Sequence, residues 1–223
     1  MNTIREEYLH RLDEEFNSMS NTLIEQLELL SLIIKGNNDP VSMFEKMKLN
    51  EQSINRSEVI IREEIVNTIV LNSPKAKDLR RIIAYFDMIG DIERAADLLY
   101  NTGKRMLALL DKESLFTLFQ DDISFLYEKA NYMIQNAIFA FVKEDENIAK
   151  NVIASDDIVD KLHADLQKKM LSMTIPEKYP HILADSLTIG RISYNIERIG
   201  DGATNIAEAV IFLTEGKDIK HTH

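Results

Sequence analysis

Cysteine and tryptophan are absent from this 223-residue chain, and glycine and proline are scarce, with 7 and 4 residues. The lack of cysteine excludes disulfide bonds, thiolate metal sites and cysteine nucleophiles. Because helix breakers are rare in a chain that is 45% hydrophobic, the composition favours an all-helical protein. No apolar run approaches the length of a membrane span, and the residues after Met1 contain no signal-peptide core. We therefore expect a cytoplasmic all-α protein that does not insert into a membrane.

Positive charge is also in short supply. The chain has 26 Lys and Arg against 37 Asp and Glu, which gives a formal net charge of -11. A nucleic-acid backbone would be repelled by this charge, and so would an anionic membrane surface. Cations and basic patches on proteins are the partners that such a chain attracts. We expect no nucleic-acid partner.

The few breakers divide the chain into six long helical segments. Glycine, proline and clusters of polar residues mark the turns, and short turns make neighbouring helices run antiparallel. The expected turns are Gly36–Pro40, Asn72–Pro74, Asp111–Ser114, Lys143–Asn147 and Pro176–Pro180, and the last helix is expected to end near Gly216.

An apolar seam in the last helix has a copy 104 residues earlier. Its residues recur at alternating steps of three and four, as in a coiled coil. The seam is Ile189, Ile192, Ile196, Ile199, Ala203, Ile206, Val210 and Leu213, and its copy is Tyr85, Met88, Ile92, Ala95, Leu99, Thr102, Met106 and Leu109. We interpret the pattern as a duplication into two three-helix bundles, residues 1–112 and 113–216, followed by a polar tail, 217–223.

Each copy of this helix also carries two carboxylates four residues apart. These are Glu197 and Asp201 in the second half and Glu93 and Asp97 in the first. Residues at this spacing share one face of a helix, where their like charges repel each other. At 100° per residue, Glu197 and Asp201 lie on the side away from the apolar seam. We expect any site that they form to lie on the outer flank of the bundle.

The preceding helix of each half places a second pair at the same height. Asp156 and Asp160 lie about as far before the Pro176–Pro180 turn as the last-helix pair lies after it, and Glu51 and Asn55 do the same in the first half. Positions equidistant from the turn of an antiparallel hairpin are level with each other. We therefore expect four carboxylates to meet in the second half, and three carboxylates and an amide in the first.

Oxygen ligands alone favour a hard cation such as iron(III), manganese, magnesium or calcium. One turn further along the same helices, Asn101 and Asn205 could supply an amide oxygen or be ordinary hydrogen-bonding residues of the helix face. Arg94 and Arg198 adjoin the acidic pairs and could neutralise part of each cluster by salt bridges. The sequence leaves both alternatives open.

The run from Asn195 to Glu208, NIERIGDGATNIAE, resembles the signature of the PhoU family of phosphate-regulatory proteins, and the weaker run from Asp91 to Asp97, DIERAAD, resembles its first-repeat counterpart. The resemblance covers essentially the whole chain. It implies six helices in two repeats, dimerisation, and multinuclear metal clusters on Glu/Asp-x-x-x-Asp motifs, with iron as the first choice and manganese, magnesium or zinc as alternatives.

The resemblance further implies an adaptor rather than an enzyme. Proteins of this family act in repressing phosphate-starvation signalling, between a phosphate ABC transporter, through its ATPase, and a phosphate-sensing histidine kinase. The first half departs from the pattern, because Asn55 stands in place of an acid and Ala95 and Ala96 replace the Ile-Gly of the second motif. Metal binding in the first half is therefore expected to be weaker.

Two other functions compete with this interpretation. A ferritin-like di-iron protein needs inward-facing Glu-x-x-His motifs from two helices, and only Glu7 and His10 have that spacing. A metal-free helical interaction module, whose carboxylates bind a basic partner directly, remains the main alternative.

Overall fold

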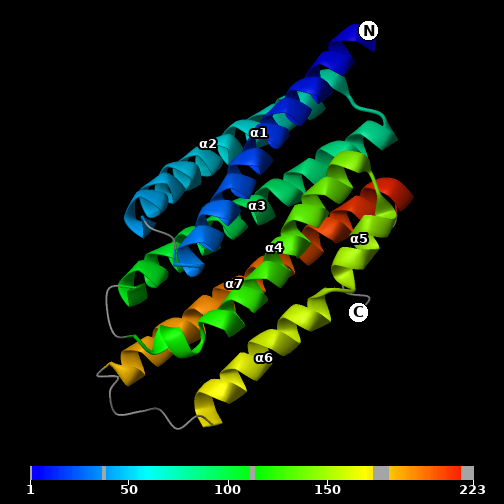
Figure 1. The fold of residues 1–223 in the computed structure, drawn as a ribbon. Helices are drawn as coiled ribbons and strands as arrows, with labels where there is room; N and C mark the ends of the chain where they lie inside the picture. The colour runs from blue at the N-terminus through cyan, green and yellow to red at the C-terminus, as the bar shows by residue number, and fades with distance from the viewer. Residues whose placement is uncertain (1, 37–38, 111–113, 173–180, 217–223) are drawn as a thin grey trace.

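The computed structural model describes residues 2–36, 39–110, 114–172 and 181–216, and these residues form α-helices, one short 3-10 helix and no strand. The all-α fold is therefore confirmed, as six helical rods of which the fifth is interrupted (Figure 1). The elements are α1 (Asn2–Ile34), α2 (Pro40–Asn72), α3 (Ala76–Leu110), η1 (Leu115–Leu118), α4 (Gln120–Lys143), α5 (Glu146–Ile153), α6 (Asp156–Ser172) and α7 (Ile182–Glu215).

The helix ends follow the local chemistry of the breakers. Asp39 caps α2, accepting a hydrogen bond from the Ser42 amide at 3.0 Å, and Pro40 occupies the first turn, where its missing N–H costs nothing. Asp145 caps α5 in the same way. Gly216 ends α7 with a φ of 71°, a left-handed conformation that glycine adopts without strain.

The two apolar seams form the centre of the protein. Every residue of both seams is buried, and all of them except the polar Thr102 belong to one hydrophobic core that runs through both halves. Each fully buried large apolar side chain contributes about 1.5–3 kcal/mol relative to exposure. The core thus accounts for the strict spacing of these residues in the sequence.

Helices α3 and α7 pack against each other, antiparallel, between the other helices. Asn195 of α7 donates to the Thr102 hydroxyl of α3, and Asn205 donates to Asp91, so that one helix rises in number as the other falls. Helix α2 packs on α1 and α3, and α6 packs on α4 and α7. Figure 1 shows α2 and α6 at opposite edges of the bundle.

The fifth rod differs from the continuous helix that the sequence predicted. Helix α5 ends at Ile153, and α6 begins at Asp156. The cause is local, because Ser155 followed by Asp156 and Asp157 is a composition typical of a helix N-terminus, where acids meet the positive end of the helix dipole. The metal-ligand candidate Asp156 therefore lies in the first turn of α6 instead of the middle of a helix.

Some expectations fall outside the described residues. These are the polar tail, 217–223, the whole turn Pro176–Pro180 and part of the connection at 111–114. Within the described ranges, no helix has the length and apolar character needed to span a lipid bilayer.

Candidate metal centre

Three carboxylates of the second half meet at the contact between α6 and α7. Oxygens of Asp156, Asp160 and Asp201 all lie within 4.8 Å of one another. Glu197, one turn before Asp201 on α7, feels the charges of all three. The structure brings three of the four expected carboxylates together across this hairpin, with Glu197 within electrostatic reach, and we call these four residues the second cluster.

A glycine allows the two helices to approach closely at the second cluster. A Cβ atom placed on Gly200 would lie 3.2 Å from Cγ1 of Val159, a contact at the short limit of what side chains adopt. Gly200 precedes Asp201, and Val159 precedes Asp160, so the closest packing of α6 on α7 occurs beside the carboxylates. Both residues are buried, which fixes the distance between the acidic faces.

Burial and the closeness of like charges raise the pKa values of carboxylates in the second cluster. Partial burial, followed by the charges of Asp201 and Asp160, raises the pKa of Glu197 from its ordinary 4.5 to about 7. Burial and neighbouring acids also raise the pKa of Asp156, against a lowering by the Thr204 hydroxyl, and burial raises the pKa of Asp201. A bound cation would relieve this crowding, because it favours the charged form of every carboxylate.

The second cluster also contains polar atoms without hydrogen-bond partners. Among the described residues, buried Oδ1 of Asp156 and buried Oε2 of Glu197 accept no hydrogen bond. Buried oxygens are normally satisfied, so orphaned ones require an explanation. An all-oxygen donor set with two such atoms fits a hard cation of the magnesium, manganese or iron(III) type.

A neutral pair of side chains lies on α6 beside this cluster. His163 has its Nδ1 atom 2.7 Å from the Ser193 hydroxyl and its Nε2 atom 2.7 Å from the Gln167 amide. Burial lowers the pKa of His163, so the ring is neutral at pH 7. Both ring nitrogens are engaged, and His163 therefore adds neither a positive charge nor a free ligand atom.

The first cluster, formed by Glu51, Asn55, Glu93 and Asp97, lies at the contact between α2 and α3. Burial, followed by the charges of Glu58, Asp97 and Glu51, raises the pKa of Glu93. Asn55 donates to Oε1 of Glu51 at 2.6 Å, while its own carbonyl oxygen is buried without a partner. The amide thus replaces a charge with an internal hydrogen bond.

Glu58 is a member of the first cluster that the sequence interpretation missed. It lies seven residues after Glu51, which is two helical turns along the same face of α2. Its carboxylate accepts two hydrogen bonds from Arg62, at 2.8 and 3.0 Å, and the Arg62 guanidinium lies 4.7 Å from the centre of the Phe86 ring. The signal was the Glu-x-x-x-Arg spacing of an ion pair on a helix.

The two asparagines are placed as hydrogen-bonding residues. Asn101 donates to the carboxylate of Asp97 at 2.9 Å and to its backbone carbonyl at 3.0 Å. Asn205 donates across the contact between α3 and α7 to Asp91 at 3.2 Å. These bonds use the amide nitrogens, so they are compatible with both alternatives that the sequence left open, hydrogen bonding alone and metal ligation through the amide oxygens.

Among the described residues, each arginine beside the motifs forms one ion pair, and each also acts to lower the pKa of the adjacent glutamate, Arg94 that of Glu93 and Arg198 that of Glu197, against the rise that burial causes. Arg198 has its Nε atom 3.5 Å from Asp201, and its Nη1 atom donates to the Tyr194 hydroxyl at 3.2 Å. Arg94 lies 3.7 Å from Asp91 instead of the predicted acidic pair. Both arginine side chains are substantially exposed, and exposed pairs contribute little.

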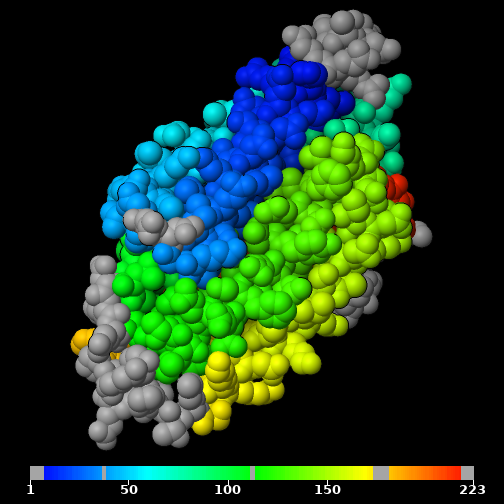
Figure 2. Space-filling view, viewed as in Figure 1, coloured from blue at the N-terminus to red at the C-terminus, as the bar shows by residue number. Residues whose placement is uncertain are grey.

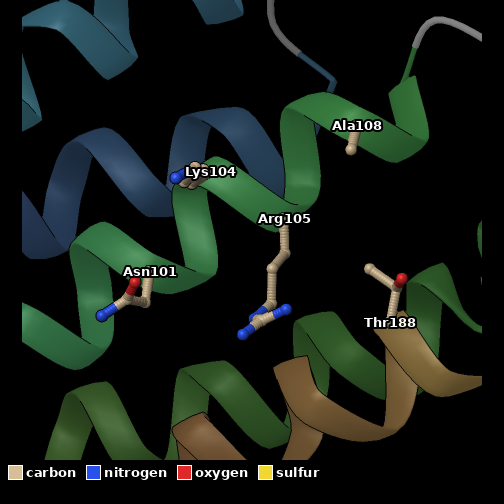
Figure 3. A pocket seen from close by; sticks show the side chains of 5 residues that line it. All are labelled: Asn101, Lys104, Arg105, Ala108 and Thr188. Atoms are coloured by element: carbon tan, nitrogen blue, oxygen red, sulfur yellow. The ribbon is translucent and has the colours of Figure 1, made fainter.

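Beyond Asn101, the lining of the contact between α3 and α7 becomes basic. A cavity of about 290 Å³ is lined by Asn101, Lys104, Arg105 and Ala108 of α3 and by Thr188 of α7. Figure 3 shows the Arg105 side chain directed from α3 towards α7, with Thr188 facing it from the other helix. No carboxylate lines this cavity among the described residues, so it is chemically distinct from the two clusters.

The sequence of the chain matches a known protein family. The profile of the PhoU domain matches two segments, residues 16–106 and 123–210. A phosphate-specific transport system accessory protein PhoU homologue from Aquifex aeolicus is 30% identical over 187 residues, which are 84% of this chain and 83% of the relative. The corresponding Xylella fastidiosa protein is 29% identical over 95% of this chain and 85% of its own length.

Solved structures share the same architecture. The crystal structure of PhoU from Pseudomonas aeruginosa superposes with a TM-score of 0.84 at 25% identity, covering 95% of this chain and 99% of that one. The phosphate transport system regulatory protein PhoU from Streptococcus pneumoniae gives a TM-score of 0.82 at 19% identity, over 97% of this chain and 99% of that one, and shows the fold alone. Both matches extend over nearly the whole chain.

Proposed function

The chain belongs to the PhoU family, and from this premise we propose that it is a phosphate-regulatory adaptor that represses phosphate-starvation signalling and phosphate uptake. The observation that supports the proposal is the match of both repeats, over 95% of this chain, to an accessory protein of phosphate-specific transport. Proteins of this family are regulatory accessory proteins and not enzymes, so the carboxylates bind and do not catalyse.

Metal binding is the second part of the proposal. Asp156, Asp160, Glu197 and Asp201 would hold the metal in the second half, with iron preferred and manganese, magnesium or zinc as alternatives. The orphaned oxygens and the raised pKa of Glu197 support this assignment, because both features are relieved by a cation. Bound metal supplies positive charge that joins α6 to α7. Glu51, Glu93 and Asp97 would hold a weaker site in the first half.

The partners follow from the charge of the chain and from its family. We assign the adaptor to the cytoplasm, as a homodimer that contacts a phosphate-sensing histidine kinase and the ATPase of a phosphate ABC transporter. The net charge of -11 directs the protein towards basic patches on those partners. Metal in either cluster reduces this charge locally, so metal content modulates the contact.

A metal-free interaction module is the competing function, in which the same carboxylates bind basic side chains of a partner directly. Exposure of Asp160 favours it, since an exposed carboxylate can reach arginine or lysine on another protein. Elemental analysis of protein purified without a histidine tag separates the two functions. Bound iron or manganese, together with a rise in melting temperature on adding the metal, supports the metal site; no metal and no rise supports the bare module.

The adaptor role is tested in cells grown with ample phosphate. Deleting the gene is expected to switch on phosphate-starvation genes, and a pull-down with the intact protein is expected to recover the sensor kinase or the transporter ATPase. Recovery of neither protein, with unchanged expression after deletion, contradicts the role. A variant with all four acids of the second cluster replaced by their amides shows whether the contact depends on that cluster.

A further inference from the structure

Helix α4 presents a line of partly exposed aromatic side chains at the surface. Phe125, Tyr132 and Phe139 are 47%, 58% and 48% exposed. They are seven residues apart, and at 100° per residue a seven-residue step returns to within about 20° of the same direction. The rings therefore form one ridge along α4. Figure 2 shows α4 uncovered at the surface between α1 and α6.

Opposite charges stand at the two ends of this ridge. Asp121 and Lys143 each lie eleven residues from Tyr132, and eleven residues at 100° each again fall within about 20° of the same line. Both side chains are exposed, and Nζ of Lys143 lies 5.8 Å from the centre of the Phe139 ring. Along α4 the ridge therefore presents an acid, three rings and a base, with a second base, Lys129, 5.0 Å from the centre of the Phe125 ring.

This order makes the ridge complementary to itself. If a second α4 lies antiparallel on the first with Tyr132 at the twofold axis, Phe125 meets Phe139 of the second copy, because both are seven residues from the axis. The same axis places Asp121 opposite Lys143 of the second copy. A twofold interface requires such self-complementarity, and one axis here satisfies the rings and the charges together.

A groove beside the ridge adds to the fit. It has a volume of about 430 Å³ and lies between α1 and α4, where Ile24 forms one wall and Phe139 and Val142 form the other. In this register, Phe125 of the second copy lies next to Phe139. The groove therefore offers space for a ring at the place where the twofold axis brings one.

We propose that a second copy of this chain docks on α4, helix against helix, antiparallel about Tyr132. The proposal rests on the homodimer of the proposed function and deepens it by naming the surface. Asp121 and Lys143 are about 33 Å apart along α4, at 1.5 Å per residue. A single pair of helices of this length is at the small end of stable interfaces, so we expect dissociation on the order of micromolar.

A charge swap in the full-length protein tests the register. Lys143→Asp and Asp121→Lys are each expected to weaken dimerisation at least tenfold in sedimentation equilibrium, because each places like charges opposite each other in both symmetry-related contacts. The double variant is expected to restore dimerisation. Both substitutions oppose the dipole of α4, so a purely structural role predicts that their effects add instead of cancel. Lys161→Asp, on exposed α6, is the matched control.

A second variant addresses the centre of the ridge. Tyr132→Glu places two carboxylates at the twofold axis and is expected to give a monomer, with circular dichroism unchanged from the parent. If none of these substitutions changes dimerisation, the α4 surface is wrong but the homodimer itself is not contradicted. A protein that is monomeric at hundreds of micromolar overturns both. Failure of the double swap to restore dimerisation, or a ridge that binds only a different protein, also overturns the proposal.

Discussion

The two acidic clusters occupy the same place in the two repeats, but the repulsion between neighbouring carboxylates is reduced in different ways. In the first repeat Asn55 replaces one charge, and Arg62 binds Glu58 beside the cluster. At the corresponding positions of the second repeat, 105 residues later, stand Asp160, His163 and Gln167. The first cluster thus has Arg62 bound to Glu58, whereas the matching positions of the second hold a histidine–glutamine pair, and the cation near the second cluster is Arg198, 3.5 Å from Asp201. We therefore expect the second cluster, which holds four acids, to bind a cation from solution more tightly than the first.

The helices that carry the two clusters also differ. Helix α2 is continuous through the first cluster, while the corresponding rod of the second repeat is interrupted just before Asp156. Ala96 stands where the second repeat has Gly200, which permits the close approach to Val159. The second repeat is therefore built to bring its acids closer together, at a cost that the first repeat avoids.

Removing charges from the second cluster is expected to have the largest effect. The double substitution Asp160→Asn with Asp201→Asn removes two of three converging carboxylates, so metal affinity should fall by about a hundredfold or more. Isothermal titration with manganese or iron(II) measures the loss. The matched pair Glu93→Gln with Asp97→Asn should cost less, and equal losses in the two pairs would contradict the difference between the clusters. Asp157→Asn, on a neighbouring face, is the control.

Widening the contact between α6 and α7 comes next. Gly200→Leu overpacks the contact with Val159 and should lower stability by about 2 kcal/mol, or roughly 6 °C in Tm. Metal affinity of the second cluster should fall with it, since the acidic faces move apart. Gly190→Ala is the matched control, because a Cβ there meets no atom within 4 Å. It should raise stability by up to about 1 kcal/mol. An unchanged Tm for Gly200→Leu would show that the close approach is not needed.

Giving the first cluster its missing acid sharpens the comparison further. Asn55→Asp adds a fourth carboxylate and removes the hydrogen bond to Glu51, so metal affinity of the first cluster should rise roughly tenfold while the metal-free protein loses stability. Titration of metal in the background of the disabled second cluster isolates the effect. Asn136→Asp, on α4, adds the same charge elsewhere and should leave affinity unchanged. If Asn55→Asp does not raise the metal affinity of the first cluster, the role assigned to Asn55 is contradicted.

The smallest expected effect concerns pH. Because the pKa of Glu197 is about 7 in the folded protein against an ordinary 4.5, the folded state holds a proton that the unfolded state has already lost. The corresponding stability is fully present below pH 4.5 and is lost as pH rises to 7. Without metal, Tm should fall by about 3 °C across this window, a figure reduced for solvent screening. Glu197→Gln should flatten the profile, and Asp157→Asn should not.

Much of this arrangement can be predicted from the sequence. The apolar seams identify the core because helical periodicity translates directly into burial, and equal distances from a turn place Asp156 and Asp160 level with Glu197 and Asp201. Three features escaped prediction for physical reasons. Arg62 was not considered because it lies beyond the acidic motif, the partner of Asn205 lies in the other repeat, and the break at Ser155 contains neither glycine nor proline.

The position of α3 and α7 between the edges of the bundle has a consequence for metal binding by the two clusters. The first cluster lies at the contact between α2 and α3 and the second at the contact between α6 and α7, and Figure 1 shows α2 and α6 at opposite edges of the bundle, so no single ion can bridge the two clusters. If metal binds as proposed, the charge at the edge that holds the second cluster would follow the supply of dissolved metal. The edge that holds the first cluster would respond less, because its proposed site is weaker and Arg62 already pairs with Glu58 there.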